Sequence, residues 1–317
     1  AGTGILMPIG LGHHSPIVWG GFTLVVLVLL VLDLFVVNRR SRVLTLGESA
    51  RWFGVLVVLA LVFGLFLLRQ EGPRSMLEYY TGYLIELSLS VDNLFVFILI
   101  FQYFAVPAAR QTRVLKWGIM GALVLRALMI MGGALLLQRF GWLTWVFGAI
   151  LVFTGWKMLT RSEVRVTPER NPVVRLARRF LPVADAYEGD RFLVRGGRGW
   201  RLTPLLLVLL TIEWTDLVFA IDSVPAVFAV TRDPFIVYSS NVFAILGLRA
   251  LFFLVAGLLD RFRHLKSGVA VVLLFVGVKM ALTPVLHVPI GISLGIIVGV
   301  LGGAVALSLR PAAPAPE

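Results

Sequence analysis

The sequence contains no cysteine among its 317 residues. Disulfide bonds, Cys-ligated zinc sites, iron–sulfur clusters and thiol catalysis are therefore excluded for this chain. Histidine is also scarce, and no two of the four histidines have the spacing of a metal-binding pair on one helix face. HExxH, GxGD and P-loop patterns are missing as well, which argues against an intramembrane protease or an ATP-driven pump. We expect neither enzyme activity nor a bound cofactor.

Charged residues are few as well. They make up 15% of the chain, whereas 59% of the residues are hydrophobic and the mean hydropathy is +0.93. Soluble domains contain about 45–50% apolar residues, so the composition predicts a membrane protein with several spans. The net charge of +12 does not indicate nucleic acid binding, because the basic residues fall between apolar runs and do not alternate with stacking aromatics.

A membrane span needs about 20 largely apolar residues, and the sequence predicts an all-α polytopic protein with about nine of them. The nine predicted spans are 17–37, 51–69, 77–104, 117–137, 142–158, 203–230, 236–258, 268–283 and 289–309. Most basic residues lie in alternate loops, on one side of the membrane. The positive-inside rule therefore predicts that the N-terminus lies outside and the C-terminus in the cytoplasm.

Residues 160–202 form the one long polar segment of the chain, and it is rich in arginine. This composition suits the anionic inner leaflet of a membrane. We predict a cytoplasmic basic loop that lies along the membrane and has no core of its own, with a regulatory or partner-binding role as the alternative. Residues 311–317 are Pro/Ala-rich and are predicted to be a disordered tail.

Two parts of the chain resemble each other. The matching pairs are IELSLSVDN (85–93) with TDLVFAIDS (215–223), LRALMIMGGALL (125–136) with LRALFFLVAGLL (248–259), and LVFTGWKM (151–158) with LLFVGVKM (273–280). Each unit holds three predicted spans, an odd number, so the second unit crosses the membrane in the opposite direction to the first. Inverted repeats of this kind are typical of secondary transporters, whose substrate site lies near the midplane between the repeats.

The repeat divides the chain into six predicted parts. These are an N-terminal pair of spans (1–76), the first three-helix repeat (77–159), the basic loop (160–202), the second, inverted repeat (203–284), a final span (285–310) and the tail (311–317).

Five carboxylates lie inside the third and sixth predicted spans, several residues from either end. They are Glu86, Asp92, Glu213, Asp216 and Asp222. An acidic side chain at the centre of a span costs about 2.5–3.5 kcal/mol and is typically functional. Arg126 and Arg249 lie at a similar depth, so five negative charges face two positive ones. A divalent cation and one proton would neutralise the difference.

The predicted ligands are oxygen atoms, without cysteine, histidine or methionine at the same positions. Such a set favours a hard cation, Mn²⁺, Mg²⁺ or Ca²⁺, over Cu⁺ or Zn²⁺. The predicted metal ligands are Glu86, Asp92, Asn93, Asp216, Asp222 and Ser223. Glu213 and Asn241 are predicted to carry protons or to orient the ligands, and Arg126 and Arg249 to act as counter-ions. The alternative is that the acids only pair with the two arginines and brace the bundle.

The five acids cannot all face one ion from straight helices, because residues six apart on a helix point about 120° away from each other. Pro225 lacks the hydrogen bond to Ile221 and disfavours helical geometry at Val224. We therefore predict a break in the sixth span beside Asp222. A matching break in the third span follows from the repeat alone.

The motifs ELSLSVDNLFVF, EWTDLVFAIDSVPAV and SNVFAILGLRALFF, with the paired GWKM and GVKM, resemble the TerC family of bacterial integral membrane proteins, related to the lysine-exporter-like superfamily. The resemblance covers residues 17–309. It implies a multispan protein of the bacterial inner membrane, in a family with some members linked to Mn²⁺ efflux and others to tellurite resistance. The acidic motifs of the family match this sequence at Glu86, Asp92, Asn93, Glu213, Asp216 and Asp222.

Two functional hypotheses follow. The first is a secondary exporter of Mn²⁺ that exchanges the ion for protons, with membrane lipids as its surroundings and no nucleic acid partner. The second is a membrane component that does not transport, and that acts in a tellurite-resistance or envelope-stress assembly through the loop at 160–202. Neither protein partners nor the oligomeric state can be read from the sequence.

Overall fold

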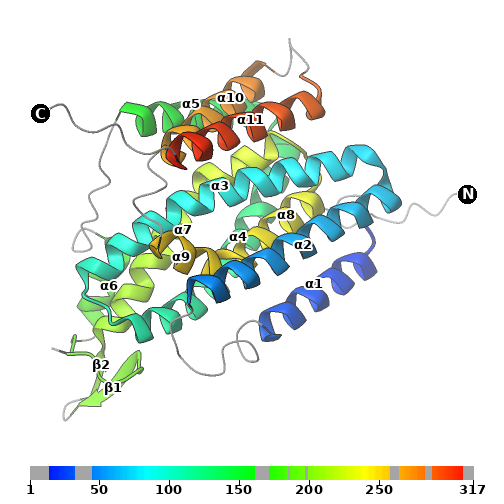
Figure 1. Ribbon diagram of the computed structural model, residues 1–317. Helices are drawn as coiled ribbons and strands as arrows, with labels where there is room; N and C mark the ends of the chain where they lie inside the picture. The colour runs from blue at the N-terminus through cyan, green and yellow to red at the C-terminus, as the bar shows by residue number, and fades with distance from the viewer. Residues whose placement is uncertain are drawn as a thin grey trace, which may run out of the picture.

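The computed structural model describes residues 14–32, 45–160, 171–180, 182–184, 186–196, 199–257, 264–282 and 288–309, with the backbone alone for Asp92, Phe180, Gly196 and Leu309. The described chain is almost entirely helical (Figure 1). The helices are α1 (Pro16–Val31), α2 (Leu46–Glu71), α3 (Pro73–Tyr103), α4 (Ala108–Arg139), α5 (Leu143–Thr160), α6 (Pro172–Phe180), α7 (Pro204–Phe228), α8 (Pro234–Leu246), α9 (Leu248–Gly257), α10 (Leu265–Leu282) and α11 (Ile290–Leu309). Two short strands, β1 (Leu193–Gly196) and β2 (Gly199–Leu202), form an antiparallel hairpin.

The protein is an all-α polytopic membrane protein. Within the described residues, seven helices are long and apolar enough to cross a membrane, and α8 with α9 makes an eighth if the bent pair is counted as one span. Each of the nine predicted spans overlaps one of these helices, the α8–α9 pair or, for the first span, α1. Helix α1 has 16 residues and rises about 24 Å, less than the roughly 30 Å of a bilayer core. The rest of the first predicted span, residues 33–37, lies outside the described residues.

Helix α3 is the centre of the bundle. In its most apolar stretch 76% of the residues are buried, and it contacts α2, α7, α8, α9, α10 and α11. In the corresponding stretches of α5 and α11 only 17% are buried, so these helices lie at the periphery (Figure 1). A helix surrounded in this way can carry polar side chains, because protein rather than lipid covers them.

Helices α2 and α3 form a tight hairpin. Gly72 ends α2 and precedes Pro73, the first residue of α3, with φ of +96°, a backbone conformation that favours glycine. The two helices approach closely at Gly64, where a Cβ atom would lie 2.2 Å from the ring of Tyr80. The Tyr80 hydroxyl donates to the Leu61 carbonyl oxygen at 2.7 Å.

Corresponding helices of the two predicted repeats run in opposite directions. A single cavity at one end of the bundle is lined by the first turns of α3, α5 and α8 and by the last turns of α4, α7 and α10. Thus α3 opposes α7, α4 opposes α8, and α5 opposes α10, as an inverted repeat requires. Following the predicted orientation, we name this end, with the α2–α3 junction, the outer end, and the end with α6 and the hairpin the inner end (Figure 1).

The contacts between α5 and α10 are reciprocal. A Cβ atom on Gly155 would lie 2.8 Å from the carbonyl oxygen of Ala270, and one on Gly277 would lie 2.9 Å from that of Gly148. In the sequence alignment of the repeats Gly155 corresponds to Gly277, and Gly148 to Ala270. Each contact therefore becomes the other when the repeats are exchanged, which is the pattern that a pseudo-twofold axis between the two helices produces. Small residues at such interfaces are typical of close packing in membranes.

The break in the bundle lies in a different span from the predicted one. Helix α7 continues without interruption through Pro225 to Phe228, so the break predicted beside Asp222 is wrong. Pro225 lies in the last turn of the helix, where one missing hydrogen bond costs little, and membrane helices tolerate proline when neighbours satisfy the backbone. The third span, α3, also runs unbroken.

The seventh predicted span is bent instead. It consists of α8 and α9, which meet at Gly247 with an angle of 47°. Glycine has a low helix propensity, and its missing side chain makes room for the ring of Phe53 from α2, which would lie 3.3 Å from a Cβ atom. The corresponding residue of the first repeat is Val124, and α4 is continuous there. The break places Arg249 in the first turn of α9.

The segment 160–202 contains more structure than predicted. Helix α6 and the hairpin pack on the inner end of α7, where Val174, Leu202 and Leu207 form a small buried cluster. Val183 also pairs with Leu202 in a single parallel bridge. The described part of the segment therefore has secondary structure, and its apolar side chains pack against the first turns of α7 rather than forming a separate core.

The same segment is attached to the junction between α3 and α4. The Tyr187 hydroxyl donates to the Phe104 carbonyl oxygen at 2.7 Å, and Asp190 lies 4.0 Å from Arg110 and 3.9 Å from Arg113. Burial raises the pKa of the Tyr187 phenol, and the Arg110 guanidinium over its ring acts in the opposite direction. The hydroxyl thus remains a hydrogen-bond donor at neutral pH.

We expect Gly277→Val to destabilise the protein. Its added side chain would clash with the backbone carbonyl oxygen of Gly148, which cannot rotate away as a side chain could. Overpacking of this kind costs about 1–3 kcal/mol. The variant should have a clearly lower melting temperature in detergent than the wild type. Gly299→Val is the control, because no atom lies within 4 Å of its added Cβ. Equal melting of the two variants would contradict the close α5–α10 contact.

Candidate functional site

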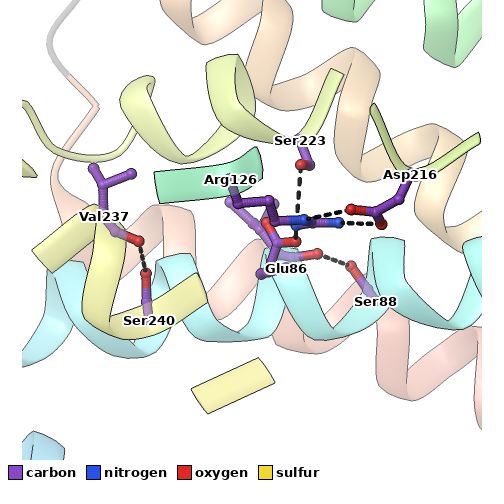
Figure 2. A network of polar contacts seen from close by, with 8 residues as sticks. Glu86, Ser88, Arg126, Asp216, Ser223, Val237 and Ser240 are labelled. Carbon is purple, nitrogen blue, oxygen red and sulfur yellow. Dashed lines mark hydrogen bonds and ion pairs between the residues drawn. The ribbon is translucent and has the colours of Figure 1, made fainter. Parts of the chain in front are cut away.

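The centre of the site is the side chain of Arg126, on α4. Its guanidinium forms an ion pair with Glu86 on α3 and lies 3.2 and 3.4 Å from the two carboxylate oxygens of Asp216 on α7 (Figure 2). Its third contact is the Ser223 hydroxyl, at 3.3 Å. The consecutive helices α3 and α4 thus converge with the distant α7 on one cation.

All three charged side chains are removed from solvent. Glu86, Arg126 and Asp216 are 0%, 1% and 2% exposed. Two carboxylates against one guanidinium leave a formal charge of −1 in a region of low dielectric constant, where uncompensated charge is costly. The cluster therefore has capacity for further positive charge. Glu86 and Asp216 are the residues that the repeat alignment places at equivalent positions.

The remaining acids of α7 point elsewhere. Glu213 packs against Gly121 of α4, where a Cβ atom would lie 2.1 Å from its carboxylate. Asp222 lies six residues after Asp216, and its side chain accepts a hydrogen bond of 2.9 Å from the Thr154 hydroxyl on α5. Because α7 is not broken at Pro225, Asp222 and Asp216 face different neighbours.

Several neutral polar side chains near this depth are buried without a hydrogen-bond partner in the part of the chain that the structure describes. The Asn241 amide is 1% exposed, and neither its nitrogen nor its oxygen is bonded. The amide nitrogen of Asn93 and the hydroxyl of Ser90, both on α3, are also buried and unsatisfied. Buried polar groups normally have partners, so these groups indicate a place where water or an ion is accommodated.

The predicted ligand set is thus brought together only in part. Glu86, Asp216 and Ser223 meet at Arg126, whereas Glu213 and Asp222 lie on other faces of α7. The side chain of Asp92 lies outside the described part of the structure, and Arg249 is fully buried on α9. Among the described residues no group of three or more His, Asp and Glu side chains is arranged to hold a metal ion.

Sequence reasoning missed two polar residues. Thr154 binds Asp222 and could have been found in the repeat alignment, because it replaces the apolar Val276 of the second unit. Glu78, in the first turns of α3, is 8% exposed and is paired with Arg74 at 2.8 Å. Its position near a span end made it resemble an ordinary interfacial charge.

Comparison with known proteins identifies the family. Residues 71–313 match the integral membrane protein TerC family. The chain belongs to this family. Among the relatives of this TerC protein, an uncharacterized membrane protein of Myxococcus xanthus is 47% identical over 303 residues, which cover 95% of each chain.

Other relatives of the TerC protein have similar lengths. A protein of Escherichia coli K12 named "Putative membrane-bound redox modulator Alx" is 46% identical over 297 residues, covering 90% of this chain and 92% of its own. An uncharacterized membrane protein of Rickettsia bellii is 40% identical over 283 residues, covering 89% and 94%. No solved structure matches the chain.

We expect Arg126→Met to destabilise this TerC protein strongly. The change leaves Glu86 and Asp216 without their buried partner, and breaking a buried ion pair costs about 3–5 kcal/mol. The double variant Arg126→Met/Asp216→Asn should regain part of the loss, since it removes one stranded charge. The melting temperature in detergent measures both effects.

Arg139→Met is the matched control for this comparison, because Arg139 lies on the same helix and is exposed. It should melt like the wild type. Two results would show that the carboxylates do not depend on Arg126. One is that Arg126→Met also melts like the wild type. The other is that the double variant melts at a lower temperature than Arg126→Met alone.

Proposed function

We propose that this protein is a secondary transporter that exports a divalent cation across the bacterial cytoplasmic membrane in exchange for protons. Mn²⁺ is the first candidate for the substrate, and Mg²⁺ and Ca²⁺ use the same type of oxygen ligand. The observation that carries the proposal is the convergence of Glu86 and Asp216, one from each repeat, on Arg126 in the interior of the bundle.

The charge of this cluster explains how it could bind and release a cation. Glu86 and Asp216 offer carboxylate oxygens and Ser223 offers a hydroxyl, all of which are hard ligands. Arg126 occupies the same oxygens, so it competes with an incoming cation. In the proposed cycle the guanidinium stabilises the state without metal, and the metal displaces it from at least one carboxylate. Arg126 then acts as an internal substitute for the substrate.

Protons compete with the metal for the same groups, because a carboxylate must be deprotonated to bind. Glu213 and Asp222 lie three and six residues from Asp216 on α7. They are close enough to exchange protons with the site but do not coordinate the metal ion that Asp216 would bind. Thr154 orients Asp222 through its hydrogen bond. We assign Glu213 and Asp222 to proton coupling, and Glu86 and Asp216 to the metal.

The family and the relatives support a membrane protein but leave the activity open. The word redox belongs to the name of the E. coli relative. This chain has no cysteine, so thiol–disulfide exchange is not available to it. A membrane component without transport would work through the described part of 171–202, which is attached to the inner ends of α3, α4 and α7, and would need no buried acids.

Proteoliposome flux tests the proposal. When a proton gradient is imposed, the purified wild type should transport Mn²⁺ in the direction opposite to the proton flow. Glu86→Gln and Asp216→Asn should each lower this Mn²⁺ flux at least tenfold, because either change removes one of two carboxylate ligands. Glu188→Gln is the control, since Glu188 is exposed in the inner segment.

The competing hypothesis gives the opposite result. If Glu86→Gln and Asp216→Asn are folded and carry Mn²⁺ like the wild type, the buried cluster is not the transport site. If instead replacement of residues 171–202 by a neutral linker abolishes the cellular phenotype while both acid variants retain it, the protein acts through its inner segment.

A further inference from the structure

A second polar region lies at the outer end of the bundle. It is a cavity of about 630 Å³ between the first turns of α3 and α8 and the last turns of α4 and α7. Its polar lining includes Arg74, Glu78, Gln138, Thr144, Thr231 and Asp233. Because the chain is a membrane protein, a cavity of this size with a polar lining at the bundle end indicates a water-filled space.

The cavity lies in line with the buried cluster. Glu78 precedes Glu86 by eight residues on α3, about 12 Å along the helix axis. Phe228 lines the cavity and follows Ser223 by five residues on α7, about 7.5 Å. The cavity thus ends within two helical turns of the groups that surround Arg126.

Phe228 is the residue of α7 that lines the cavity and lies nearest to Ser223 along the helix. Its side chain is 4% exposed and packs over α4, with a ring carbon 3.0 Å from where a Cβ atom of Gly133 would lie. Helix α3 approaches α8 closely at Gly82, where a Cβ atom would lie 2.9 Å from the Ser240 hydroxyl oxygen. Ser240 lies on α8 beside α3 (Figure 2). Val227, the neighbour of Phe228 in α7, lies 3.0 Å from the same Cβ position of Gly82, so α3, α7 and α8 meet beside Phe228.

The two carboxylates of the cavity differ in their partners. Asp233 accepts from the Phe235 amide at 2.8 Å and lies 3.1 Å from the His14 ring nitrogen, so it is held by the fold. Glu78 is nearly buried, but its partner Arg74 has a side chain that is 86% exposed. An exposed partner contributes little and can leave. Glu78 is therefore the carboxylate that can exchange its partner for a hydrated cation.

The surroundings make Glu78 a weak ligand rather than a trap. The Lys279 ammonium acts on it electrostatically and is held by the Ser293 hydroxyl at 2.9 Å. A single carboxylate that is also attracted to nearby positive charge holds a divalent ion weakly, which suits release to the outside.

We propose that the cavity is the outer vestibule of the transporter, that Glu78 is the ligand to which the divalent cation passes after leaving Glu86 and Asp216, and that Phe228 closes the passage between them. The inference rests on the proposed export of a divalent cation. It assigns a role to Glu78 and Phe228, which the repeat motifs do not include.

The absence of cysteine allows a direct test, because each introduced thiol is the only one. In right-side-out membrane vesicles loaded with Mn²⁺, a cationic, membrane-impermeant methanethiosulfonate should modify Thr144→Cys, and Mn²⁺ efflux should fall at least fivefold. Gln70→Cys is the control: it is exposed at the same end but does not line the cavity. It should be modified without any change in efflux.

Glu78→Gln provides an independent measurement. It should slow Mn²⁺ efflux at least fivefold while purified protein binds Mn²⁺ with the wild-type affinity, whereas Glu86→Gln should lose binding. A merely structural role of Glu78 would reduce both. The proposal is overturned if Thr144→Cys is not modified from outside, or if Glu78→Gln and modified Thr144→Cys export Mn²⁺ at the wild-type rate. A wild type that carries no Mn²⁺ overturns the proposed function itself, and the vestibule with it.

Discussion

The ion pairs of Arg126 with Glu86 and Asp216 impose the strongest constraint on this structure. Each charge costs several kcal/mol to bury, and the cost is recovered only while the partners stay within hydrogen-bond distance. Helices α3, α4 and α7 must therefore keep one register at this depth. Helix α3 must also be covered on every side, because lipid in contact with Glu86 would leave that carboxylate unsolvated. The central position of α3 follows from its acid.

Close helix packing maintains that arrangement. Gly155 and Gly277 allow α5 and α10 to touch through their backbones, and these helices flank α7 and α3. The break at Gly247 serves a different purpose, since it turns the chain between α8 and α9 directly before the buried Arg249. Discontinuous helices also occur at the substrate sites of transporters that are built from inverted repeats.

The sequence was sufficient for the family and for most of the spans, because apolar length is a local property. It was insufficient for side-chain direction. Pro225 was expected to break α7, but the helix continues through it to Phe228, because one missing hydrogen bond in the last turn costs little. The bend occurs instead at Gly247, where the missing side chain leaves room for Phe53. Asp222 and Glu213 have the same type of side chain as Asp216, and only the contacts with Thr154 and Gly121 show that they face other neighbours. The fold of the described residues between 171 and 202 depends on contacts with α7 that no local pattern reveals.

The central claim is that a divalent cation and Arg126 use the same two carboxylates. An anomalous-scattering map from crystals soaked in Mn²⁺ tests it most directly. The account predicts a peak about 2.0–2.6 Å from oxygens of Glu86 and Asp216, with the Arg126 guanidinium moved away from at least one of them. A map without a peak between α3 and α7, in which Arg126 still holds both carboxylates at saturating Mn²⁺, would contradict it.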